Sequence, residues 1–281
     1  MRLSRVQVDL GEVAAIEHRG NLYRVDRLDA ILGVALPEDV LPAASFARRV
    51  LALGVSTLAA HAEALADGTH LEDALLGPGA RLLPPTGVDP VVLELSAAGS
   101  SRSFRVSGRA VFGHGGCGLL ARGAGALRVA PALAVIVGED LHVPSLAEAH
   151  GAVLGVSLAL AWSLVDEHDA ARAEGLGPGP ARDVGTHIGP IVTVGYDLDR
   201  PIFAQLAAGT ETVPTTLVAG RDRVAHALVH AARYGELRAG DVLLIPGAGA
   251  HTVAPATTVS LRAESLGRLD GKLGLAEEDP P

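Results

Sequence analysis

The segment 127–190 constrains the fold more than any other part of the chain. It begins at 127–138 with a continuous apolar run that is rich in β-branched residues and ends in glycine, as expected of a buried strand. Residues 144–165 are predicted to form a helix that runs into a second apolar strand, and Asp166 follows at its end. The turn at Gly189-Pro190 precedes another strand-like run. This order predicts a β-rich core in which an acidic side chain at a strand end faces a pocket.

The composition agrees with a protein of many short strands. A chain of 281 residues with 48% hydrophobic content can form one large core, or a large and a small domain. Aromatic residues make up only 3%, so alanine, valine and leucine must form the core, and 34 glycines and 17 prolines predict many turns. The main part is predicted to contain strands at 90–95, 103–106, 109–112, 127–137, 160–165, 191–195, 202–207, 242–246 and 257–263, and helices at 145–157 and 221–235.

Three regions are predicted along the chain. Residues 1–78 form a small N-terminal α/β domain, 79–275 form the main domain, and 276–281 form a disordered tail. The first domain is predicted from a period-2 pattern, a hairpin-like turn and three helical patterns, which fall at 4–10, 18–21, 28–32, 43–53 and 58–66.

Charge and cysteine content exclude several classes of protein. The net charge of −9 and the absence of a basic run speak against nucleic-acid binding. The single cysteine, Cys117, cannot form an intramolecular disulfide, and the start of the chain lacks the apolar stretch of a signal peptide. The longest uncharged apolar segment, 151–165, is too short to span a bilayer. These features predict a cytoplasmic protein without a membrane partner, and the near absence of lysine is typical of a high-GC bacterium.

The order of landmarks resembles the fumarylacetoacetate hydrolase family, which includes related 2-oxo-acid hydratases and decarboxylases. Residues 237–245 are similar to the family's "L-x-P-G-D-V-I" strand entry, and 266–269 to its closing "GLG-x-L" segment. Residues 109–115 and 119–123 stand where the family has its "L-I-G-P-G" turn and following strand. The resemblance covers 80–275. It implies an α+β, β-rich fold with a mixed β-roll core, a small N-terminal domain and a homodimer.

The resemblance also implies a divalent metal, held by a Glu-x-Glu pair and a later Asp. The corresponding positions carry methyl groups, which cannot bind Mg²⁺ or Mn²⁺; they are Ala130, Ala132 and Ala161. We therefore predict no metal cofactor. The alternative is an ordinary Mg²⁺- or Mn²⁺-dependent enzyme whose ligands are Glu139 and Asp140.

Four residues are predicted to be catalytic. Asp166 or Glu167 is expected to act as a general base, and His168 to share proton transfer near neutral pH. The alternative is a helix N-terminus, where acidic residues suit the helix dipole. Asp183 agrees with the family pattern although the family's lysine is replaced by Pro180, and the alternative for Asp183 is an Asx-turn.

Two glycine-rich loops are predicted to bind the substrate. His114, Gly115 and Gly116 lie in a loop whose backbone N–H groups suit a carboxylate or enolate oxygen. In the second loop Gly247 replaces a family threonine that binds the substrate carboxylate, and His251 is expected to supply a donor instead. The alternatives are an ordinary turn with a surface histidine and a flexible hairpin loop.

These features predict a diverged enzyme that acts on a 1,3-dicarbonyl or 2-oxo-acid-type small molecule. Acid–base chemistry without a metal is expected to drive a C–C cleavage, hydration, isomerisation or cyclisation. The alternative is a catalytically inactive family member that serves as a binding or scaffold protein, because the segment 93–101 has no counterpart of the family's catalytic "N-Y-x-x-H". A pocket filled by apolar side chains would favour this alternative.

Overall fold

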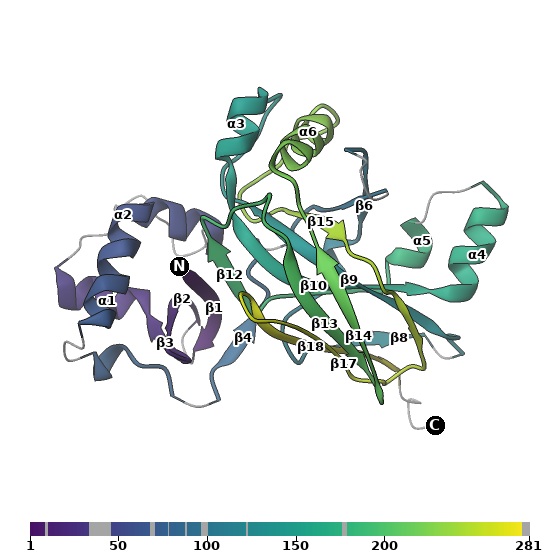
Figure 1. Ribbon diagram of the computed structural model, residues 1–281, viewed down its shortest axis with the longest axis horizontal. Coiled ribbons are helices and arrows are strands. Elements are labelled where there is room, and N and C mark those ends of the chain that lie inside the picture. The colour runs from purple at the N-terminus through teal and green to yellow at the C-terminus, as the bar shows by residue number, and fades with distance from the viewer. Residues whose placement is uncertain are drawn as a thin grey trace.

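The structure is a computed structural model. It describes residues 1–8, 11–33, 46–67, 71–77, 79–87, 89–96, 101–121, 123–175 and 179–276. Within these ranges the strands form a thirteen-stranded and a five-stranded sheet, with helices at the periphery (Figure 1). None of the helices in these ranges has the length and apolar character needed to cross a membrane.

The larger sheet combines strands from both ends of the chain. Its strands are β1 (Arg2–Val8), β2 (Gly11–His18), β3 (Asn21–Arg24), β4 (Arg81–Leu83), β5 (Val92–Leu95), β6 (Ser103–Val106), β7 (Val111–Phe112), β9 (Leu127–Val137), β10 (Val153–Leu164), β11 (Thr186–Ile188), β12 (Ile191–Val194), β15 (Val242–Pro246) and β16 (His251–Val253). The main order is β3-β2-β1-β12-β10-β9-β15-β5-β6. β4 pairs with β1, β11 with β10, β7 with β11, and β16 with β9.

The antiparallel pair β9 and β10 is the centre of this sheet. It runs from the Leu127–Leu164 pair to the Val137–Val153 pair, and most of its residues are buried. The predicted strand 127–137 is therefore confirmed. The predicted helix 145–157 is wrong beyond α3 (Leu146–Gly151), because Val153 already belongs to β10. A strand buried on both faces has no polar side. Its sequence therefore lacks the alternation of apolar and polar residues that distinguishes a strand from a helix.

The smaller sheet has the order β14-β13-β17-β18-β8. Its strands are β8 (Cys117–Leu120), β13 (Ile202–Ala208), β14 (Glu211–Leu217), β17 (Val259–Ala263) and β18 (Gly267–Leu275). Along β13 buried and exposed residues alternate, so Leu206 joins the main core while Phe203 and Gln205 face outward. The sequence predicted β13, β15 and β17, and missed β8, β14, β16 and β18.

Helices cover the sheets at three places (Figure 1). α1 (Val25–Leu32) and α2 (Phe46–Ala66) lie beside the N-terminal strands, and residues 43–45 of the predicted helix lie outside the described ranges. α6 (Arg221–Ala232) confirms the predicted helix at 221–235 and packs beside α3. Its predicted stripe, from Val224 to Ala232, is buried. α4 (Val165–Ala173) and α5 (Gly179–Arg182) follow β10.

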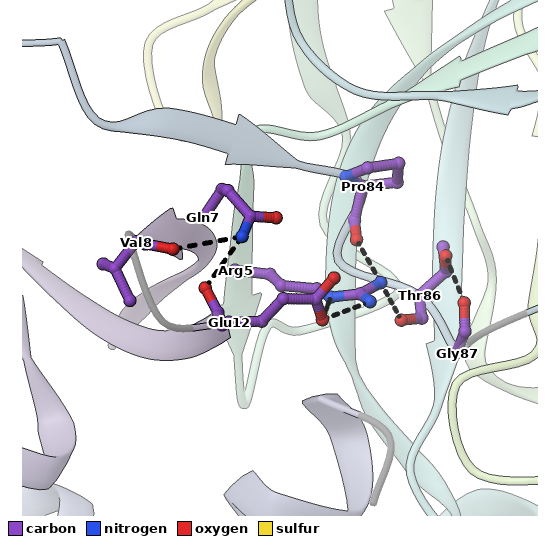
Figure 2. Close-up of polar contacts among 8 residues, drawn as sticks. Arg5, Gln7, Val8, Glu12, Pro84, Thr86 and Gly87 are labelled. Carbon is purple, nitrogen blue, oxygen red and sulfur yellow. Dashed lines mark hydrogen bonds and ion pairs between the residues drawn. The ribbon is translucent and has the colours of Figure 1, made fainter. Parts of the chain in front are cut away.

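Arg5 joins the N-terminal hairpin to the main part of the chain (Figure 2). Its guanidinium donates to the Glu12 carboxylate on β2 and to the carbonyl oxygens of Pro84 (3.3 Å) and Thr86 (2.9 Å). β1 also pairs with β12, so the N-terminal strands continue the larger sheet. The division at residues 78 and 79 stays a prediction, and the predicted tail lies outside the described ranges beyond Ala276.

Candidate functional site

A hollow of about 310 Å³ lies between β4 and the loop that leads into β8. We call it the glycine-loop pocket. It contains the three residues that were predicted to bind substrate in this loop, together with a cation from β4. Its lining consists of Arg81, Leu82, Leu83, Pro84, Gly113, His114, Gly115, Gly116 and Cys117.

His114 presents a hydrogen-bond donor in this pocket. The backbone N–H of Asp270 on β18 donates to His114 Nδ1 over 3.1 Å. Because Nδ1 accepts, the neutral imidazole carries its proton on Nε2. Nε2 lies 4.0 Å from Asp270 Oδ2, which is beyond hydrogen-bond distance. The Nε2–H group of His114 is therefore available to a ligand oxygen.

Asp270 keeps a negative charge beside His114. Burial raises the pKa of the Asp270 carboxyl, but hydrogen bonds from the Ser260 hydroxyl and the Arg268 guanidinium outweigh it. The pKa of Asp270 therefore lies below its ordinary value of 3.8. Arg268 Nε donates to Asp270 Oδ1 over 2.8 Å, and Ser260 donates to the same oxygen.

The backbone amides of the glycine loop are already engaged. Gly115 N–H donates to Asp270 O over 2.8 Å, and Gly116 N–H donates to Gly113 O over 3.0 Å. The sequence had predicted that these two amides donate to a ligand oxygen. In the structure both of them already donate to carbonyl oxygens of the chain. The Arg81 side chain is exposed, and its guanidinium has no hydrogen bond or ion pair with any described residue. His114 Nε2–H and the Arg81 guanidinium are the polar groups that the pocket offers to an anion.

His187 forms a hydrogen bond to the glycine loop, and the sequence had not assigned it a role. Trp162 Nε1–H donates to His187 Nδ1 over 3.0 Å, and His187 Nε2–H donates to Gly116 O over 3.0 Å. Burial lowers the pKa of His187, although the hydrogen bond to the Gly116 carbonyl opposes this shift. His187 is therefore held neutral in the core. No local motif marks it, because its partners come from separate strands.

The four predicted catalytic residues lie elsewhere. Asp166 and Glu167 are exposed in the first turn of α4, as the alternative of a helix N-terminus had predicted. His168 follows them and is half-buried. Asp183 is also exposed, and its Oδ1 accepts from the Ser107 N–H over 3.0 Å. None of the four lines the glycine-loop pocket. Their catalytic role stays a prediction.

The second predicted loop is also separate from this pocket. Gly247 N–H donates to Pro131 O over 2.8 Å, beside the central strand β9. His251 begins β16, where its Nδ1 lies 3.4 Å from Glu211 Oε2. The structure therefore places Gly247 and His251 together, apart from His114. Their role in substrate binding stays a prediction.

The positions that the resemblance assigns to metal ligands are packed in the core. Ala130 pairs with Ala161 across β9 and β10, and Ala132 and Ala161 are buried among apolar residues. The alternative ligand pair is exposed beyond β9, where Asp140 Oδ1 accepts from the Ala239 N–H. Within the described part of the chain, no group of three or more His, Cys, Asp or Glu residues is placed to hold a metal ion. These residues do not fit a divalent ion.

Comparison with known proteins identifies the fold. No family model and no curated protein matches the chain. Solved structures do match over the whole chain. A probable 2-hydroxyhepta-2,4-diene-1,7-dioate isomerase from Mycobacterium abscessus has 16% identity and a TM-score of 0.72, with 99% of this chain and 100% of that chain covered. Fumarylacetoacetate hydrolase from Exiguobacterium antarcticum has 16% identity and a TM-score of 0.68, with 98% and 100% covered.

A third similar structure corrects one prediction. Maleylpyruvate hydrolase from Sphingobium sp. SYK-6, with 15% identity, a TM-score of 0.69, and 99% and 100% covered, was solved in complex with manganese(II) ion and pyruvate. The prediction of no metal cofactor is therefore wrong for this fold. It rested on three alanines, and a position without a ligand excludes a metal ion only from that position. The predicted resemblance and the β-rich α+β fold are confirmed.

Proposed function

We propose that this chain, which has the fumarylacetoacetate hydrolase fold, is a diverged enzyme that performs acid–base chemistry on a small oxo-acid in the glycine-loop pocket. The observation that carries this proposal is that His114 Nε2–H and the Arg81 guanidinium, which have no hydrogen-bond partner among the described residues, line the same pocket. Pockets for small molecules begin at about 300 Å³, so this one suits a short-chain acid. Two of the similar structures are named for a dioate and a maleylpyruvate, both organic acids.

The chemistry follows from the two polar groups. The Arg81 guanidinium pairs with the carboxylate of the oxo-acid. The carbonyl or enolate oxygen then accepts a hydrogen bond from His114 Nε2–H, which stabilises negative charge that develops on this oxygen. The Asp270 backbone N–H, which donates to Nδ1, holds the His114 ring in the tautomer that carries its proton on Nε2. The pocket thereby favours the enolate of the bound acid, whose C3 proton passes to a solvent water molecule. This enolate is an intermediate of isomerisation and the leaving species of C–C cleavage.

Proton exchange tests the proposal before the natural substrate is known. We expect the chain to accelerate exchange of the C3 protons of pyruvate and oxaloacetate with deuterium, followed by proton NMR. His114→Gln should slow this exchange by at least about 100-fold, as loss of a general acid or base does. His226→Gln is the matched control, because it removes an exposed histidine on α6, outside the pocket.

Two outcomes would contradict the proposal. Exchange that is as fast in His114→Gln as in the wild type would remove His114 from the chemistry. Loss of exchange in Asp166→Asn but not in His114→Gln would move the active site to the start of α4, where the sequence had predicted it.

The second candidate is a binding protein without catalytic activity. The observation that favours it is the apolar packing of Ala132 and Ala161, where the resemblance implies metal ligands. Saturable binding of an oxo-acid that depends on Arg81, without any proton exchange, would support this candidate. A homodimer and a bacterial, cytoplasmic origin remain proposals that rest on the resemblance and on composition alone.

A further inference from the structure

Two adjoining hollows lie on the outer face of the smaller sheet. One has a volume of about 960 Å³, and the other about 410 Å³. Phe203 on β13 and Glu264 line both hollows, so together they form one groove, which we call the Phe203 groove. Three arginines also line it, Arg2, Arg200 and Arg262, together with Gln205. None of them lines the glycine-loop pocket.

Arg262 stands opposite a second arginine on the outer face of the smaller sheet. On the outer face of β17 it stands opposite Gln205 on β13 and Arg268 on β18. Like charges directly opposite each other in a sheet repel. Arg268 is compensated, because it donates to Asp270 and to Ser260. The Arg262 side chain is exposed, and its guanidinium has no hydrogen bond or ion pair with a described residue. A bound anion would relieve this repulsion.

Further arginines enter the groove from both ends. Arg200 lines the smaller hollow and is exposed. Arg2 lines the larger hollow, although it is paired with Glu17 over 2.7 Å. Glu264 is the opposing carboxylate. In a chain of net charge −9, three arginines that line one groove are a local exception.

Phe203 supplies a flat apolar surface between these cations. It is one of four phenylalanines in the chain and is 75% exposed. A large apolar side chain that is this exposed on a sheet face leaves apolar area in contact with water and gains no stabilisation from packing. A ring that stacks on Phe203 would cover this area, and a negative group on that ring would reach the neighbouring guanidinium groups.

We propose that the Phe203 groove is a second binding site, for a planar organic anion. The ring of the ligand packs on Phe203, and its carboxylate or phosphate pairs with Arg262. The volume of the larger hollow lies within the range of small-molecule sites, about 300–1,000 Å³. This site is independent of the proposed chemistry at His114.

Binding of three related probes to the full-length chain tests the proposal. The probes are 2-naphthoate, 2-naphthyl phosphate and the uncharged 2-naphthylmethanol, and calorimetric titration at low salt measures their affinity. We expect at least one anion to bind saturably and at least about tenfold more tightly than the alcohol, since a charge-assisted hydrogen bond contributes that much. The two anions separate a carboxylate site from a phosphate site.

The variants locate the site. Arg262→Gln should weaken the anion at least about tenfold, and Phe203→Ala should weaken both the anion and the alcohol. Lys272→Gln is the matched control, because Lys272 is an exposed cation on the same sheet outside the groove. His114→Gln should bind the probes like the wild type, which separates this test from that of the proposed function. All these side chains are solvent-accessible, so circular dichroism should confirm that the variants fold.

Four results would overturn the proposal. Equal affinity for the anions and the alcohol would mean that charge is not recognised. Equal losses in Arg262→Gln and Lys272→Gln would mean that any surface cation suffices. Absence of saturation with both anions, or loss of binding in His114→Gln, would mean that the groove is not the site.

Discussion

His187 is buried, and both of its ring nitrogens take part in hydrogen bonds. Burial holds its pKa below the ordinary value of 6.5, so the unfolded chain binds more protons than the folded chain as the pH falls below that value. The stability that neutral His187 contributes is therefore present above about pH 6.5 and is lost as the pH falls toward the folded-state pKa. A side-chain amide makes the same two kinds of hydrogen bond without titrating.

We predict that the wild-type chain loses stability between about pH 7.5 and pH 5.5 more steeply than His187→Gln. All other groups titrate in both proteins, so the difference between the two curves isolates His187. Denaturant unfolding followed by fluorescence measures this well, because Trp162 is the single tryptophan and contacts His187. Parallel curves for the two proteins would contradict the prediction.

Some residues at the glycine loop could be identified from the sequence, and others could not. The loop could be proposed as a ligand site from the sequence, because clustered glycines beside a histidine are visible in the chain itself, and that role stays a prediction. Its partner Asp270 was not, since it lies 156 residues away and reaches His114 only through the parallel pairing of β18 with β8. The sequence carries no local signal for such a pairing. Arg81 is hidden for the same reason, because β4 reaches the loop only after it pairs with β1.

At the scale of elements, composition determined which strands were predictable. β9 is β-branched toward its end and is bounded by glycine, so its period and length identify it. β10 consists largely of leucine, alanine and serine, whose propensities do not favour a strand, and its pairing with β9, β11 and β12 makes it one. β14 carries Pro214 and lies at a sheet edge, where proline is tolerated but its sequence signal is weak.

A buried ion pair attaches α5 to the larger sheet. Arg182 donates to the Glu94 carboxylate on β5, with Nε at 2.9 Å, and to the Trp162 carbonyl on β10. Arg182→Met keeps the apolar stem and leaves Glu94 without its cation, and the Glu94 side chain is only 13% exposed. We expect a loss of about 3 kcal/mol in unfolding free energy, at the lower end for a broken buried pair.

The surface pair of Arg238 and Glu236 provides the control for this prediction. Their side chains are 70% and 44% exposed, so Arg238→Met should change the unfolding free energy by less than about 1 kcal/mol. Addition of Glu94→Gln to Arg182→Met should recover part of the loss, because it removes the unpaired charge. Equal effects of Arg182→Met and Arg238→Met in urea unfolding would show that the buried pair does not anchor α5.

At the scale of the whole molecule, the two sheets meet where β18 passes the His187 ring. A Cβ atom at Gly271 would lie 2.6 Å from the ring atoms Cγ and Cδ2 of His187. Gly271 therefore allows the smaller sheet to approach the larger one. The same approach brings Asp270 to His114, so the junction between the sheets also sets the geometry of the glycine-loop pocket.

Gly271→Ala should consequently destabilise the chain by about 1–3 kcal/mol, the usual cost of overpacking. Gly274→Ala on the same strand is the control: its nearest atom would be Cys117 Sγ at 3.6 Å, an ordinary contact, and we expect a change within about 0.5 kcal/mol. Because His187 accepts from the Trp162 indole, Gly271→Ala should also shift the tryptophan emission of the folded chain, and Gly274→Ala should not. Equal stabilities of the two variants would mean that the sheets do not depend on this close approach. A stability loss without a change in emission would mean that β18, rather than His187, moves to make room for the added methyl group, and the geometry of Asp270 and His114 would then change with it.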